Sequence, residues 1–389
     1  MISFVWSSRY PFLGGAGGTE SYTAGHAREL TRRGIPARII IIGHDIIQSQ
    51  ADFPDIDFLR LDDKKQLEDL DDTLVFVTYP LNVRTRQPSY AILHCPPPNY
   101  ARNDDQYDIR AFKGKKLITA SKFAAGLWRR YLRGKALRMP TVYAFAAPAF
   151  AAAERPKRPK PAKARVLFAG RLSPDKGIYT LMAALHMDEL KNVDFRLTVT
   201  SSGAMTEEGQ TIYKLVKAHP RIRVVQARKT PESMARLMAR HDIVIMPSTG
   251  IYWQELFGIV SVEAQHAGCR VVASRSGGLP ETNVGGLMLA LPDNPKSLAR
   301  GIAMAIARGP LTARERAAAA RQFTLTESVD SLLKAIRYTP QDGPQAQLLP
   351  GQPTLLPGLP ALLSNPAGSK YRRRGLGLGG STSAAGPKN

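Results

Sequence analysis

The sequence predicts an α/β protein with two doubly wound parallel sheets, each in its own domain. Short buried runs typical of strands alternate with amphipathic runs typical of helices along most of the 389 residues. Residues 151–163 are rich in Pro, Lys and Arg and lack periodicity, which indicates an interdomain linker. The chain is long enough for each domain to bury its own core. We therefore expect one domain over residues 1–150 and a second over residues 164–322.

The first domain begins with a strand, a glycine loop and a helix. Gly17 and Gly18 belong to the loop, and the helix that follows has an apolar face at four-residue spacing, formed by Tyr22, His26 and Leu30. Glu20 stands where a dinucleotide fingerprint would have its third glycine, so that motif is excluded. The loop still lets a ligand approach the backbone closely, with a plain tight turn as the alternative. The strands expected in this domain cover residues 2–6, 37–42, 74–77, 90–93 and 117–120.

Polar residues follow the fourth of these strands. His94 stands at the carboxyl end of the strand, which faces the ligand crevice in a doubly wound sheet. The loop at 103–108 is either a solvated turn or an acidic element that contacts an acceptor, and its carboxylates are Asp104, Asp105 and Asp108. A helix expected at 121–132 has an apolar stripe with basic residues mostly off it. Core packing with a solvated basic face is favoured for it over a membrane-surface helix.

The second domain opens with a strand at 166–169 and a basic loop that runs to Gly177. Arg171 and Lys176 stand five residues apart on this strand-to-helix loop, so both cations can converge on the oxygens of a diphosphate. Further strands are expected at 196–200, 223–226, 243–246 and 270–273, and helices at 178–185, 232–240 and 299–308. A closing helix is expected within 323–338. The Pro-, Gly- and Ser-rich composition of 339–389 is typical of a disordered tail.

Residues 243–281 read as strand, loop, helix, strand and loop. Glu255 precedes the helix and Glu263 lies within it; eight helical steps would place them about 12 Å apart, a separation suited to gripping both ends of a nucleotide-sugar. A Glu can accept two hydrogen bonds from ribose hydroxyls. The free N–H groups of the helix start form an anion site, contributed by Phe257, Gly258, Ile259 and Val260. The alternative is a buried structural helix with a solvated Glu at each end.

These motifs resemble a known family. Glu255-x7-Glu263, together with the Gly277–Gly278 turn and its following Leu-Pro-Glu, is similar to the donor site of the retaining glycosyltransferases of family 4. The basic loop at 170–177 is close to the Gly-Arg-x-x-x-x-Lys-Gly of the same family. The resemblance implies the GT-B architecture, in which two Rossmann-like domains face each other across a cleft and the last helix crosses back onto the first domain.

The resemblance also implies roles for the candidate residues. Arg171 and Lys176 would neutralise the leaving diphosphate, Glu255 would orient the sugar, Glu263 would bind the ribose, and His94 would contact the sugar. Gly17, Gly18 and the amides of residues 257–260 would complete the donor site. The expected donor is a UDP-linked sugar, with no metal and no cofactor. The family usually continues to an Asn-Gly near the domain junction, where this chain has the sequence YAFAAP at 143–148 instead.

The acceptor and the reaction leave alternatives open. The chain as a whole, and residues 170–190 in particular, look most similar to family members that decorate aminoglycoside antibiotics. A polycationic acceptor of that kind needs local acid. The candidate carboxylates on the first-domain side are Glu20, Asp104, Asp105 and Asp108. A lipid-linked acceptor would use the basic helix at 121–132 instead. A sugar-nucleotide epimerase of the same architecture is the alternative reaction.

The composition of the chain limits the classes of ligand and partner that we expect. A net charge of +22 favours anionic ligands, but no specific nucleic-acid partner is expected because the aromatic residues do not interleave with a basic stripe. Two cysteines, Cys95 and Cys269, indicate neither a disulfide framework nor a Cys-cluster zinc site. We read no signal peptide and no apolar run of about 20 residues, so a cytoplasmic location is expected. The sequence gives no indication of oligomeric state.

Overall fold

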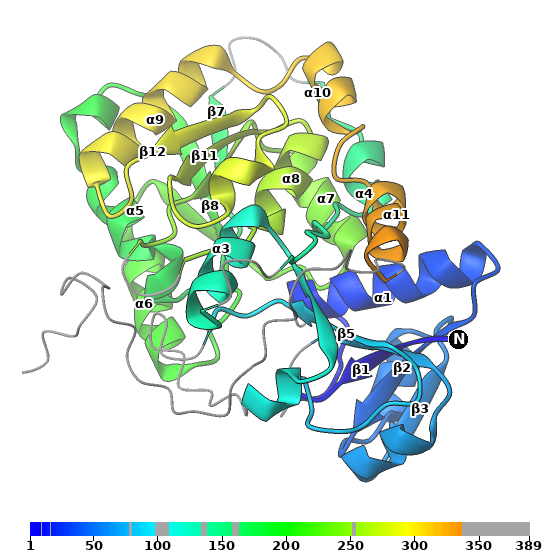
Figure 1. Ribbon diagram of the computed structural model, residues 1–389. Helices are drawn as coiled ribbons and strands as arrows, with labels where there is room; N and C mark the ends of the chain where they lie inside the picture. Colours follow the sequence, from blue (N-terminus) through cyan, green and yellow to red (C-terminus); the bar gives the residue numbers. More distant parts are fainter. Residues whose placement is uncertain are drawn as a thin grey trace, which may run out of the picture. The chain divides into compact units, whose positions relative to one another are not determined.

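The computed structural model describes residues 1–8, 10–15, 17–77, 80–97, 109–133, 138–157, 163–250 and 254–336 (Figure 1). These residues form two parallel six-stranded sheets, each flanked by helices. The α/β fold class with two doubly wound sheets is confirmed. We call the sheet of β1 to β6 with its helices the first lobe, and the sheet of β7 to β12 with its helices the second lobe.

The first sheet has the strand order β3-β2-β1-β4-β5-β6, with parallel pairing throughout. The chain runs outward from β1 to β3 and then returns to the other side of β1 with β4. Ligands of doubly wound sheets bind outside the carboxyl ends of the strands at such a reversal. The strands are β1 (Ile2–Trp6), β2 (Ala37–Ile42), β3 (Phe58–Leu61), β4 (Thr73–Phe76), β5 (Ser89–Leu93) and β6 (Lys115–Thr119).

The helices of the first lobe place their apolar stripes in its core. Tyr22, His26 and Leu30 of α1 (Gly18–Arg32) are all buried, as their spacing predicts. In α3 (Lys122–Tyr131) Ala124, Leu127 and Trp128 of the predicted stripe are buried and Phe123 and Tyr131 are half-buried, which supports core packing for this helix. The remaining elements are α2 (Ile47–Asp52) and the 3-10 helices η1 (Lys64–Asp69) and η2 (Ile109–Phe112).

The last described helix, α11 (Leu325–Ile336), completes the core of the first lobe although it follows the second lobe in sequence. It lies beside α1 in Figure 1, and the Ser328 hydroxyl is 3.1 Å from Nε2 of His26. Val329 and Leu332 belong to the same apolar cluster as Leu30. The chain therefore crosses between the lobes twice, once before β7 and once before α11.

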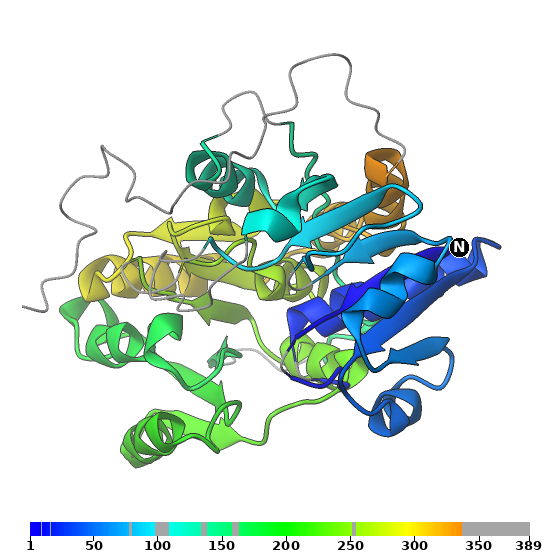
Figure 2. The ribbon, with the colours of Figure 1, turned by 60° about the horizontal axis from the view of Figure 1, so that its bottom comes forward.

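The second sheet has the order β12-β11-β10-β7-β8-β9, again all parallel, so its winding reverses between β7 and β10. Helices cover both of its faces, as Figure 2 shows from a second side. Alternate residues of β7 serve the two faces, with Val166 and Phe168 in one apolar cluster and Leu167 in the other. The strands are β7 (Ala164–Phe168), β8 (Phe195–Thr200), β9 (Ile222–Val225), β10 (Ile243–Met246), β11 (Arg270–Ser274) and β12 (Leu287–Ala290).

The helices of the second lobe mostly follow the predicted alternation. The α-helices are α5 (Ile178–Ala184), α6 (Glu207–Ala218), α7 (Pro231–Ala239), α8 (Ile259–His266), α9 (Pro295–Arg308) and α10 (Ala313–Ala319). The 3-10 helices are η3 (Pro174–Lys176), η4 (Asp188–Leu190) and η5 (Leu279–Thr282). The first two residues of the predicted linker belong to a further helix, α4 (Pro148–Ala152), which has Pro148 in its first turn.

Candidate functional site

Two loops meet at the carboxyl ends of β7 and β10, where the second sheet reverses. The backbone of Gly177 has a φ of 71°, and a Cβ there would lie 1.8 Å from the carbonyl oxygen of Pro247. Only glycine allows this approach of the two loops. The N–H of Thr249 also donates to the carbonyl of Asp175 at 3.0 Å. Lys176 on the first loop and Glu255 on the second are thereby brought together, although 79 residues separate them.

The Lys176 ammonium donates a short hydrogen bond to Oε1 of Glu255, and the Ser248 hydroxyl donates to the same oxygen at 3.2 Å. The side chains of Lys176 and Glu255 are 17% and 16% exposed, so the pair is accessible to a ligand but largely shielded from bulk water. Both of these hydrogen bonds go to Oε1, and none to Oε2 of Glu255 is seen among the described residues. Ser248 was not predicted as a site residue, although it follows a buried strand closely, and ligand-binding residues of doubly wound sheets stand at the carboxyl ends of strands.

Arg171 lies at the rim of this site. Its guanidinium is 3.6 Å from the carboxylate of Asp175, which is also 3.8 Å from the Lys176 ammonium. The Arg171 side chain is 63% exposed, so this weak pairing leaves it free to turn toward a phosphate. The structure thus places both predicted cations around one carboxylate.

The start of α8 lies next to the Lys176–Glu255 pair. Gly258 precedes the helix with a φ of 91°, and a Cβ there would lie 2.5 Å from the side chain of Leu279. Ile259 and Val260 are the first helical residues, so their N–H groups have no acceptor within the helix. Gly18 at the start of α1 faces this end, because a Cβ on it would lie 3.8 Å from Cγ2 of Ile259. The starts of two helices, with Gly17 exposed beside them, therefore border one space that favours an anion.

Glu263 lies on α8, one turn beyond these amides. It is half-buried, and desolvation raises the pKa of its carboxyl to about 7. The group therefore changes its protonation near neutral pH, where a carboxylate and a carboxylic acid would bind ribose hydroxyls differently.

We expect this titration to appear in nucleotide binding and in stability. Calorimetric UDP affinity should rise by up to about tenfold between pH 6 and pH 8, because the ionised Glu263 accepts two hydroxyl hydrogen bonds. Glu263→Gln should bind more weakly and lose this dependence. In the free protein, a raised pKa of Glu263 contributes stability at low pH that is lost as the pH rises toward 7. The melting temperature of Glu263→Gln should therefore rise relative to that of wild type as the pH increases from 5 to 8. A UDP affinity that is flat with pH in wild type would contradict this role.

His94 lies at the carboxyl end of β5, as predicted. Its ring centroid is 4.7 Å from that of Tyr22, and its buried Nε2 has no hydrogen-bond partner among the described residues. Burial, together with the nearby His26, lowers the pKa of the imidazole to about 3, so the ring is neutral. A neutral imidazole with one unused nitrogen can accept from or donate to a ligand hydroxyl.

Of the four predicted acceptor-side carboxylates, Glu20 lies among the described residues. Glu20 is half-buried in the first turn of α1, where burial raises the pKa of its carboxyl. Its Oε2 would lie 2.9 Å from a Cβ on Gly17, so the carboxylate folds back over the helix start. Asp104, Asp105 and Asp108 lie outside the described residues.

A family model described as "Glycosyl transferases group 1" matches residues 163–308. Residues 163–308 are thus similar to the group 1 glycosyl transferases. This segment contains Arg171, Lys176, Glu255 and Glu263, so all four second-lobe side chains predicted to contact the donor lie within the matched residues. The match ends before α10 and does not include the first lobe.

Curated relatives and solved structures extend the comparison. The chain is 32% identical over 182 residues to the glycogen synthase of Mycobacterium tuberculosis, which covers 45% of this chain and 41% of that protein. It is 34% identical over 124 residues to the D-inositol 3-phosphate glycosyltransferase of Corynebacterium kroppenstedtii, covering 30% and 26%. The matched part thus spans less than half of the length of these curated relatives. The structure of Anabaena HepE in complex with UDP-glucose superposes with a TM-score of 0.63 at 19% identity, over 86% of this chain and 99% of that one. Both lobes together therefore have the GT-B fold.

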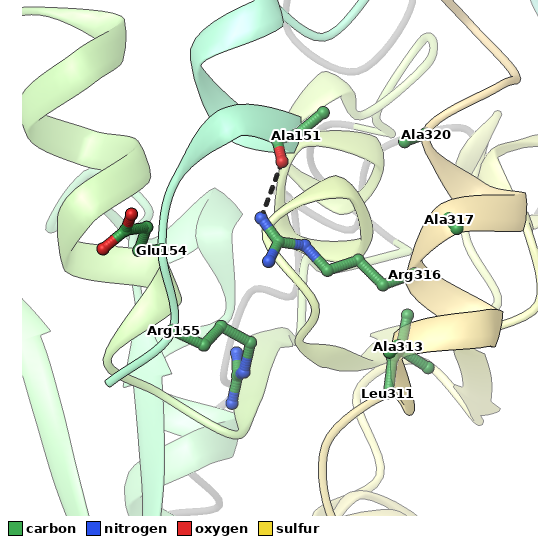
Figure 3. Close-up of a pocket in the computed structure, with 8 residues that line it drawn as sticks. All are labelled: Ala151, Glu154, Arg155, Leu311, Ala313, Arg316, Ala317 and Ala320. Atoms are coloured by element: carbon green, nitrogen blue, oxygen red, sulfur yellow. Dashed lines mark hydrogen bonds between the residues drawn. The ribbon is translucent and has the colours of Figure 1, made fainter. Parts of the chain in front are cut away.

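A hollow of about 580 Å³ lies at the opposite end of α8 from the candidate site (Figure 3). Arg316 and Arg155 line it, and both bind the last carbonyls of α8: Arg316 donates to His266 at 2.9 Å, and Arg155 to Ala267 at 3.2 Å. Arg316 also donates to Ala151 at 2.8 Å. These guanidiniums satisfy the carboxyl end of α8 and fix the start of the predicted linker to it.

Two further features of the described residues concern metal binding and membrane-spanning helices. Across the described ranges, no cluster of three or more His, Cys, Asp or Glu side chains could hold a metal ion. No helix in the part of the chain that the structure describes is long and apolar enough to cross a bilayer.

Proposed function

We propose that the chain is a retaining glycosyltransferase that moves a sugar from a UDP-linked donor to a small hydroxylated acceptor. The observation that carries the proposal is the Lys176–Glu255 pair, held at the reversal of the second sheet beside the free amides of α8. This site combines cations, helix-start N–H groups and a carboxylate, the chemistry that a nucleotide diphosphate-sugar requires. The group 1 family match and the structural likeness to a protein bound to UDP-glucose support the same donor class.

Each residue has a role in this proposal. Arg171 and Lys176 bind the diphosphate and neutralise the charge that develops as it leaves, so the reaction does not depend on a metal. The amides of residues 257–260 bind a phosphate or a sugar hydroxyl, and Glu263 accepts hydrogen bonds from the ribose. Glu255 orients the sugar ring, and the neutral His94 contacts it from the first lobe.

The family resemblance implies retention, and the way in which Glu255 is held supports it. One of its oxygens accepts from both Lys176 and Ser248, so it is built to accept hydrogen bonds and to hold a hydroxyl rather than to attack carbon. The acceptor hydroxyl then attacks from the face that the diphosphate leaves. Its proton passes to the departing phosphate oxygen, the bond from the anomeric carbon to that oxygen breaks, and the new glycosidic bond forms on the same face.

For the acceptor we propose an aminocyclitol or aminoglycoside intermediate. The half-buried Glu20 carboxylate supports this choice, because it folds over the start of α1, facing α8, and places acid there in a chain of net charge +22. An anionic acceptor would be repelled at this position and a cationic one attracted.

Mass spectrometry of products from a panel of nucleotide-sugars and acceptors tests the proposal. We expect UDP and a glycosylated amino-sugar acceptor. An isomerised nucleotide-sugar formed without any acceptor would instead show an epimerase, and transfer that requires a lipid-linked acceptor on anionic vesicles would exclude the aminoglycoside reading.

The acidic loop gives a second test of acceptor chemistry. Neutralising Asp104, Asp105 and Asp108 together to Asn should raise the KM for an amino-sugar acceptor several-fold, because each ion pair with a cationic acceptor that is lost costs up to about 1 kcal/mol. The KM for the nucleotide-sugar should not change. Replacement of the exposed Asp62 and Asp63 on the same lobe provides the control. An unchanged acceptor KM in the triple variant would remove this loop from the acceptor site.

A further inference from the structure

Glu281 lies in the second lobe, on η5 after the Gly277–Gly278 turn, but its carboxylate binds residues of the first lobe and of the chain crossing. It accepts from the N–H of Lys122 at 2.9 Å and from the N–H of Phe123 at 2.7 Å, the first two residues of α3. It also accepts from the Tyr143 hydroxyl at 2.7 Å. Burial and the Glu281 charge raise the pKa of Tyr143, so this hydroxyl keeps its proton and donates.

This arrangement is favourable for a helix start. The first N–H groups of α3 have no acceptor inside the helix, and a carboxylate there also interacts with the positive end of the helix dipole. The third N–H of α3, from Ala124, is taken by the Ser121 hydroxyl at 2.9 Å. Two of the three caps of α3 therefore come from a residue about 160 positions away in sequence.

The same end of α3 holds the loop that carries Glu255. The Ser121 hydroxyl donates to the carbonyl of Leu256, and the Leu256 side chain packs with Ala124 and Leu127 of α3. The N–H of Gly278 donates to the carbonyl of Glu255 at 2.7 Å. Residues 255 and 256 are therefore fixed between α3 and the loop of Glu281.

Tyr143 holds the next residue of that loop. Its ring centroid is 5.3 Å from that of Phe257 and 5.2 Å from that of Phe323, and the rings of Phe257 and Phe323 are 5.3 Å apart. Tyr143 belongs to the first crossing between the lobes and Phe323 to the second. Glu281 thus joins, through one carboxylate, the two elements that fix residues 255–257.

We propose that Glu281 is a positioning residue, which binds the start of α3 and Tyr143 rather than the substrate and holds Glu255 in place for sugar transfer. The inference rests on the proposed function for its effect on turnover. A displacement of Glu255 by about 1 Å would cost up to about 10²-fold in rate without removing any donor contact.

The test compares Glu281→Ala, Glu281→Gln and Tyr143→Phe, assayed well below their melting temperatures. We expect kcat of Glu281→Ala to fall about 10- to 100-fold while the calorimetric UDP affinity stays within about twofold. Glu281→Gln should recover part of the loss because it keeps one acceptor oxygen. Glu281→Ala combined with Tyr143→Phe should cost less than the sum of the two, because they share one contact.

Amide hydrogen exchange gives a readout that does not need activity. Exchange at Lys122, Phe123 and residues 256–258 should accelerate in Glu281→Ala. The matched control is Glu315→Ala, because Glu315 caps α10 through the N–H of Thr312 at 2.7 Å within the second lobe alone. It should lower the melting temperature, leave kcat unchanged and leave exchange in α3 unchanged.

Several results would overturn the inference. A kcat within twofold of wild type in Glu281→Ala would show a purely structural contact, and a weakened UDP affinity with unchanged kcat would show a donor ligand. Unchanged exchange at residues 122–123 and 256–258 would show that Glu281 does not fix these segments. If wild type transfers and hydrolyses no nucleotide-sugar, the proposed function fails, whereas the exchange result still decides what Glu281 holds.

Discussion

Glu255→Ala is expected to reduce sugar transfer by at least about 10³-fold while the protein remains folded. The carboxylate accepts from Lys176 and Ser248 through one oxygen, and the loop that carries it is fixed by its backbone and by its neighbours Leu256 and Phe257. The loop should therefore survive the loss of the side chain. Under the proposed function transfer should not survive, because the sugar would lose its orientation and Lys176 would lose the partner that holds it at the proposed diphosphate site.

The measurement is kcat with circular dichroism and melting temperature alongside. Glu154→Ala is the matched control, because Glu154 is exposed at the opposite end of α8 and should be silent in transfer. Turnover near that of wild type in Glu255→Ala would remove Glu255 from the reaction.

Lys176→Ala is expected to have the second large effect. Its kcat should fall about 10²- to 10³-fold, whereas its UDP affinity should fall less than about tenfold. The charge on the leaving diphosphate is greatest in the transition state, so a cation held against it contributes more to turnover than to binding. The low exposure of Lys176 strengthens the effect because the charge acts away from bulk water. The measurement compares the change in kcat with the change in the dissociation constant of UDP.

Lys163→Ala removes the same charge just before β7, at the end of the strand away from the site, where Lys163 pairs with Asp194 at 2.9 Å. It should change neither quantity. Equal losses of turnover and affinity in Lys176→Ala would mean that the lysine only binds phosphate in the ground state.

The elements that could be predicted are those with a clear pattern of burial. β5, β10 and β11 are buried at every residue and lie close to the predicted bounds. β3 and β12 were missed, because each has only four residues, stands at a sheet edge and is only partly buried. α9 begins four residues before the predicted helix because the Asn294 side chain caps it, accepting from Ser297 at 2.8 Å. α10 was also missed, although its capping box of Thr312 and Glu315 is readable in sequence.

The functional residues of the candidate site could be predicted where they lie on a single loop. The contacts between residues on two different loops could not. The helix start at 257–260 and the position of His94 after β5 follow from local patterns, and the structure places both as expected. The pairing of Lys176 with Glu255, the contact of Gly18 with Ile259 and the hydrogen bonds of Glu281 join distant segments. Spacing along the chain carries no information on such contacts, because they depend on how the loops pack.

The most direct test of retaining transfer at this site needs no acceptor. Proton NMR should follow the slow hydrolysis of UDP-sugars by wild type and by Lys176→Ala, with water acting as the acceptor. We expect that wild type first releases the sugar with the anomeric configuration that it has in the donor, and that Lys176→Ala does so about 10²- to 10³-fold more slowly. Initial release of the opposite anomer, or a rate that does not depend on Lys176, would contradict it.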